Sequence, residues 1–115
     1  MYNDWLRALD FYRGEVNILR NRLTEIAGKN TADDTMKQVE HFENQFVLHT
    51  DNIDQLQHNI RENISVIGKE AAGRNGYVDA SLLQKSEVQK NQFIQEEKLV
   101  HELRHAFNRF CIEHM

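Results

Sequence analysis

The sequence predicts an all-α protein: one domain built as an antiparallel three-helix bundle of long helices. Two observations on the 115-residue chain favour this class. There is no proline and there are only five glycines, which disfavours the turn-rich chains of β-sandwiches. Apolar residues also recur at spacings of three and four over long stretches, as they do along one side of a helix. Short polar and glycine-containing segments divide these stretches into three.

The first helix is expected at about residues 2–27. Gly28 is expected to end it, and Thr31 with Asp34 to cap the next helix. Because this connection is short, the first two helices are expected to be antiparallel neighbours. The apolar residues of the first helix follow the a/d spacing of a long helix–helix seam. They are Tyr2, Trp5, Leu9, Tyr12, Val16, Leu19, Leu23 and Ile26.

The second helix is expected at about residues 31–72, a length typical of coiled coils. Two polar residues, His49 and Asn63, interrupt its apolar seam. The whole seam consists of Val39, Phe42, Phe46, His49, Ile53, Leu56, Ile60, Asn63 and Ile67.

The third helix is expected at about residues 80–113. The segment 73–79 (GRNGYVD) has the composition of a loop, and Asp79 or Ser81 is the expected cap. The second half of the helix has an apolar seam, whereas its first half places polar side chains at seam positions. The apolar positions are Phe93, Val100, Leu103, Phe107 and Phe110, and the polar ones are Ser86, Gln89 and Glu96.

The lengths of the helices predict how far they overlap. If the first helix folds back on the second, it covers residues up to about Gln57. The hairpin of the second and third helices is then expected to extend beyond the first helix as a coiled coil. The apolar residues left partly exposed there are Ile60, Ile64, Ile67, Phe93 and Ile94, and a second exposed stripe is Phe11 with Ile18.

These stripes suggest a function in association. Burial of each such side chain is worth roughly 1.5–3 kcal/mol before entropy is counted. We therefore expect either a homodimer that completes a four-helix bundle at the thin end or binding of another helical protein.

The polar residues of the seam are interpreted as register-setting core residues. A polar residue inside a seam lowers stability but fixes alignment, a role best known for buried asparagine. This interpretation applies to His49 and Asn63, with Tyr12 as the expected hydrogen-bond partner of His49. It predicts that His49→Leu raises the melting temperature and loosens the association state.

One segment, HELRH at residues 101–105, resembles the HExxH motif of zincin metalloproteases. The resemblance implies zinc held by His101 and His105, with Glu102 as base. The helix phase that puts Leu103 on the seam turns both histidines toward water, where a bundle has no cleft. The pair His58 and Glu62, taken with these histidines, is also similar to fragments of the di-iron pattern of hemerythrin. Zinc or iron binding by these histidines is therefore the alternative to an interaction role.

Charge and composition exclude several classes. The net charge is −4, and residues 28–72 carry eight acidic and four basic residues. Without a basic cluster, nucleic-acid binding is not expected. No apolar run is long enough to span a membrane. The single cysteine and the absence of a signal-peptide pattern favour the cytoplasm. We expect no enzymatic activity and no cofactor.

Overall fold

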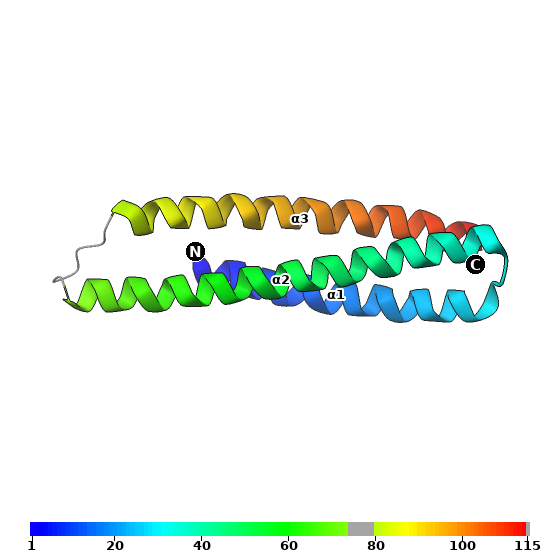
Figure 1. Cartoon of the computed structure of the whole chain (residues 1–115), viewed down its shortest axis with the longest axis horizontal. Helices are drawn as coiled ribbons and strands as arrows, with labels where there is room; N and C mark the ends of the chain where they lie inside the picture. Colours follow the sequence, from blue (N-terminus) through cyan, green and yellow to red (C-terminus); the bar gives the residue numbers. More distant parts are fainter. Residues whose placement is uncertain (74–79, 115) are drawn as a thin grey trace.

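The structure, a computed structural model, describes residues 1–73 and 80–114. Over these residues the chain forms three helices, α1 (Tyr2–Lys29), α2 (Asp33–Gly73) and α3 (Ala80–His114). They make a slender bundle of 63 × 18 × 18 Å (Figure 1). The all-α, three-helix prediction is confirmed. In the part of the chain described, no helix has an apolar stretch long enough to cross a membrane.

The order of contacts gives the direction of the helices. Asp10 of α1 accepts a hydrogen bond from Gln57 of α2, whereas Arg20, further along α1, contacts Glu43, earlier in α2. Residue numbers therefore rise along α1 as they fall along α2, so these two helices run in opposite directions. Figure 1 shows that α3 turns back again and ends beside the connection between α1 and α2.

The first connection has the predicted length but lies two residues later than the sequence predicts, at residues 30–32. α1 continues through Gly28 to Lys29, and the side chain of Asn30 donates a hydrogen bond to the carbonyl of Ile26 at 2.8 Å. This bond satisfies one of the acceptors that a helix end leaves without a partner. α2 then begins at Asp33. Thr31 lies two residues before this start, too early to be the N-cap residue that the sequence predicts.

The second connection lies mostly outside the described residues. Of the predicted loop at 73–79, only Gly73 is described, and it ends α2. The predicted cap Asp79 is likewise outside the described residues. Because α3 begins at Ala80, Ser81 lies within its first turn instead of preceding it.

The core follows the predicted seams. From Trp5 to Ile26, every predicted apolar position of α1 is buried. The core includes a cluster of four phenylalanines at the end where α1 joins α2. The Phe107 ring centroid lies 5.3 Å from that of Phe42 and 5.2 Å from that of Phe46, in edge-to-face geometry. Phe110 completes the cluster against Phe42 at 5.1 Å.

α1 reaches further along α2 than the predicted limit at Gln57. Its first residue, Tyr2, accepts a hydrogen bond at its hydroxyl from the amide of Asn63 at 2.9 Å. The whole of α1 therefore packs along α2, from Tyr2 beside Asn63 to the short connection at residues 30–32. In Figure 1, α2 and α3 continue past the start of α1, but this two-helix extension is shorter than predicted. Its coiled-coil character stays a prediction.

This longer overlap corrects the predicted stripe at the thin end. The indole of Trp5 stacks on Phe93 with ring centroids 5.8 Å apart, and Ile60 is completely buried. Ile60 and Phe93 are therefore core residues under α1 and are not available to a partner. Ile64 and Ile94 are exposed and Ile67 is half-buried.

Candidate functional site

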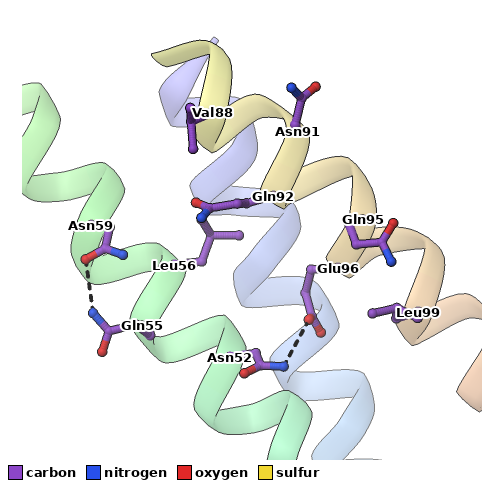
Figure 2. A pocket seen from close by; sticks show the side chains of 10 residues that line it. All are labelled: Asn52, Gln55, Leu56, Asn59, Val88, Asn91, Gln92, Gln95, Glu96 and Leu99. Atoms are coloured by element: carbon purple, nitrogen blue, oxygen red, sulfur yellow. Dashed lines mark hydrogen bonds between the residues drawn. The ribbon is translucent and has the colours of Figure 1, made fainter. Parts of the chain in front are cut away.

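A groove with a volume of about 560 Å³ lies between α2 and α3. Figure 2 shows α1 behind it, so the groove opens on the side of the α2–α3 pair that α1 does not cover. Six of its ten lining residues carry carboxamides. The lining consists of Asn52, Gln55, Leu56, Asn59, Val88, Asn91, Gln92, Gln95, Glu96 and Leu99. Because a carboxamide both donates and accepts, this surface offers both kinds of hydrogen-bonding group along its length.

The groove continues toward the start of α3. A second hollow of about 360 Å³ shares Asn59, Val88 and Gln92 with the first and extends it to Val66 and Lys85. Valine side chains in this surface are about half exposed, with 53% of Val88 and 41% of Val66 accessible. The surface therefore combines a row of amides with exposed aliphatic groups. We call the two hollows together the α2–α3 groove.

The floor of the groove rests on a buried histidine–glutamate pair. His49 Nδ1 lies 2.6 Å from Glu96 Oε2, and the two side chains are almost completely inaccessible. The other carboxylate oxygen, Oε1, accepts a long hydrogen bond of 3.5 Å from Asn52, which is drawn in Figure 2. The pair joins α2 to α3 at one position, because a hydrogen bond of this length needs a defined geometry.

Tyr12 does not contact His49 as the sequence analysis expected. Its hydroxyl donates to Glu97 Oε2 at 2.6 Å, while His49 is paired with Glu96. Burial is the main cause that raises the pKa of Tyr12 to about 12, and the hydrogen bond and negative charge of Glu97 add to it. Tyr12 thus connects α1 to α3, whereas the predicted bond to His49 would have connected α1 to α2. Any effect of Tyr12 on register therefore concerns α1 and α3.

Asn63 lies at the centre of a second buried polar group. Its amide donates to Tyr2 at 2.9 Å and to Gln89 Oε1 at 3.1 Å, so it joins all three helices. Gln89 in turn donates to the backbone carbonyl of Asn59 at 3.1 Å, and Ser86 bonds to the Tyr2 hydroxyl. These contacts give Asn63 the geometry that a register-setting residue needs; its effect on alignment stays a prediction.

The HELRH segment is split between an interface and the surface. Instead of facing water, the imidazole of His101 packs edge-on against Tyr12, with ring centroids 5.6 Å apart. Its Nδ1 accepts a hydrogen bond from Arg104, which also binds Glu15 at 2.8 Å. His105 is exposed, as predicted. The Nδ1 lone pair of His101 is therefore occupied by the guanidinium.

The remaining candidate residues lie on the surface. His58 Nε2 is 3.6 Å from Glu62 Oε2, and both side chains are exposed on α2. Over residues 1–73 and 80–114, no group of three His, Cys, Asp or Glu side chains is placed to hold a metal ion. Phe11 and Ile18 are exposed on α1, as expected for a contact stripe.

The sequence analysis missed the groove, although a signal for it is present. Beside the core seam of α2 runs a second line of residues at spacings of four and three, and it carries four polar side chains. This line consists of Leu48, Asn52, Gln55, Asn59, Glu62 and Val66. Comparison of the chain with protein-family models, with curated proteins and with solved structures gives no match.

Proposed function

We propose that this chain is a non-enzymatic interaction module that binds helices of another polypeptide chain at the α2–α3 groove. The observation that carries the proposal is the lining of the groove: six carboxamides lie between exposed aliphatic side chains such as Val88 and Val66. Helices laid against two antiparallel helices complete a four-helix arrangement, which is a common way to bury such a face.

The contacts beneath the groove support this role. The His49–Glu96 pair and the Asn63–Gln89 hydrogen bond hold α2 and α3 at two points along the groove. A surface that is already ordered loses less conformational entropy when a partner binds, so more of the contact energy remains as affinity. The groove is therefore suited to recognition of a rigid partner.

The proposal includes a cytoplasmic location and no cofactor. It assigns no catalytic residue. The single cysteine, Cys111, is buried, and a chain with one buried thiol suits a reducing compartment.

Site-specific photo-cross-linking tests the function. A photoreactive residue replaces Gln92 in the groove or, as the control, Ile94 on another side of α3. Cells of the native host are irradiated, and each cross-linked polypeptide is identified by its mass. The captured polypeptide is then purified and titrated against the wild-type chain, Val88→Glu and Ile94→Glu.

We expect a polypeptide adduct from position 92 but not from position 94. The purified partner should bind the wild-type chain and Ile94→Glu alike, and Val88→Glu at least about tenfold more weakly, because a buried charge is costly. Equal capture at both positions, or a partner that binds Val88→Glu as well as the wild type, contradicts the proposal.

A further inference from the structure

The α2–α3 groove has two edges with the same spacing. The α2 edge is the line from Leu48 to Val66 given above. The α3 edge also repeats at three and four and consists of Lys85, Val88, Gln92, Gln95, Leu99 and Glu102. Leu48 and Glu102 continue the two rows by one step beyond the residues that line the groove. Every residue of both edges is at least partly exposed. Two parallel rows of this kind form a surface two helices wide.

Each edge has a similar order of apolar and polar residues when it is followed from either end. On the α3 edge, Val88 and Leu99 are equally far from the middle, and the two residues between them are glutamines. Lys85 and Glu102 stand at the two ends with opposite charges. On the α2 edge, Leu48 and Val66 are the apolar ends of a polar row.

Such a pattern is what a two-fold interface requires. In an interface between two identical chains related by a two-fold axis, residue i contacts residue j and residue j contacts residue i. A copy rotated about an axis through the middle of the groove places the partner's Leu99 on Val88 and the partner's Glu102 on Lys85. Carboxamides then face carboxamides, and each of them can donate and accept.

We propose that the occupant of the groove is a second copy of this chain, bound as an antiparallel two-fold dimer. This rests on the proposed function and names its partner. The dimer is centred on the groove and not on the exposed end of the α2–α3 hairpin, where the sequence analysis expected it.

The apolar residues of the two edges favour the antiparallel arrangement. In the antiparallel dimer, Val88 faces the partner's Leu99, and Lys85 faces the partner's Glu102, with each contact formed twice by symmetry. In a parallel two-fold dimer the α3 edge lies on the partner's α2 edge. Val88 would then lie opposite polar residues such as the partner's Asn59, because Asn59 is across the groove from Val88.

The size of the face predicts a dimer of modest affinity. From Leu48 to Val66 the α2 edge is about 27 Å long at 1.5 Å per residue, and the bundle is 18 Å wide. The two copies together then bury about 1,000 Å², at the lower end of specific interfaces. We therefore expect a dissociation constant on the order of micromolar, within reach of sedimentation.

The first experiment is sedimentation equilibrium of the purified chain from about 1 to about 200 μM, chosen around that constant. The matched variants are Val88→Glu and Ile94→Glu, since both side chains are on α3 and are about half exposed, at 53% and 51%. We expect a wild-type dimer, a dissociation constant at least about tenfold higher for Val88→Glu, and no change for Ile94→Glu.

Reversal of charge tests the pairing across the axis. Lys85→Glu and Glu102→Lys should each weaken the dimer, because each creates two like-charge contacts by symmetry. The double variant should restore the wild-type affinity. Additive weakening in the double variant contradicts the pairing.

Disulfide cross-linking tests the orientation. Val88→Cys and Leu99→Cys chains are prepared separately, mixed and oxidised, and Cys111 is left in place because it is buried. The antiparallel dimer predicts a disulfide only between unlike chains, since the two copies of position 88 lie too far apart along the axis for a disulfide. Disulfides between like chains, or no disulfide between unlike chains although sedimentation shows a dimer, overturn the antiparallel arrangement.

The outcomes separate this inference from the proposed function. A chain that stays monomeric at every concentration, while position 92 captures a different polypeptide in cells, overturns the dimer and leaves the interaction role in place. A monomer without a groove-dependent adduct overturns both. A dimer that Val88→Glu and Ile94→Glu weaken equally also overturns the inference, because the contact is then elsewhere.

Discussion

The two ends of the three-helix region share an apolar core but differ in their polar contacts. Where α1 joins α2, aromatic rings make the contacts between helices, with Phe107 fully buried among other phenylalanines. Where α1 begins, Trp5 stacks on Phe93, and Asn63 also bonds to Tyr2 and to a glutamine of α3. Apolar burial is strong and non-directional, whereas hydrogen bonds are weaker in net effect and depend on geometry. We therefore expect a change in these hydrogen bonds to affect alignment more than stability.

The largest expected effect is at the aromatic end. Phe107→Ala removes a fully buried ring and leaves a cavity, so the free energy of unfolding should fall by about 3–5 kcal/mol. Chemical denaturation monitored by helical circular dichroism measures this. The control is Phe11→Ala, whose ring is 65% exposed and whose effect should stay within about 0.5 kcal/mol. Similar losses for both variants would mean that the aromatic cluster does not hold this end together.

The next effect lies at the buried pair between the ends. His49→Leu removes the main partner of Glu96 and leaves a buried carboxylate with one long hydrogen bond from Asn52. We expect a loss of about 2–3 kcal/mol, because an unsatisfied buried polar group costs most of its desolvation energy. This reverses the sequence-based expectation that His49→Leu raises the melting temperature.

A double variant separates the energy of the His49–Glu96 contact from the cost of leaving Glu96 buried without a partner. When both His49 and Glu96 are replaced by leucine, no charge is left without a partner, and stability should return to the wild-type value or exceed it. Thermal unfolding of the single and double variants gives the comparison. A double variant less stable than His49→Leu would show that the pair itself is strongly stabilising.

The amide end should respond in a different way. Asn63→Leu removes the bonds to Tyr2 and Gln89, and the loss in global stability should be only about 1–2 kcal/mol. The first turns of α1 should nevertheless exchange their amide hydrogens much faster, because these bonds align them. Hydrogen exchange read by mass spectrometry measures this, with Asn108→Leu at an exposed amide outside the groove as the control. Unchanged exchange in the first turns of α1 would remove the alignment role from Asn63.

The sequence predicts which side of each helix is buried better than it predicts which residues contact each other. The spacing of apolar residues identified the buried side of each helix, including His49 and Asn63, because helix geometry alone decides which residues share a face. The partner of His49 was not predictable, because spacing does not tell which residue of α3 lies opposite. The α2–α3 groove was missed for another reason: Asn and Gln in a hydropathy pattern look like a solvated surface whether or not they line a groove.

The last effect is a pH dependence that compares two tyrosines and develops only in alkaline solution. Burial, followed by the hydrogen bond to Glu97, raises the pKa of Tyr12 from 10.0 to about 12. A raised pKa means that the folded state holds the phenolic proton more tightly than the unfolded state, so the stability it contributes is complete below pH 10. That contribution should be lost as the pH rises from 10.0 to about 12. Tyr12→Phe should therefore show a shallower fall in stability across this range than the wild type.

Tyr2 is the control at the amide end. Burial raises its pKa as well, but the hydrogen bond from Asn63 acts in the opposite direction by stabilising the phenolate. Tyr2→Phe should then flatten the alkaline loss of stability less than Tyr12→Phe does, because the proton of Tyr2 is held less tightly. Urea denaturation at pH values from about 8 to about 12 gives the slopes for both variants. Of these two tyrosines, Tyr12 is the one that donates its proton to a carboxylate. If Tyr2→Phe reduced the alkaline loss of stability more than Tyr12→Phe does, burial would matter more for these pKa values than the hydrogen-bond partner.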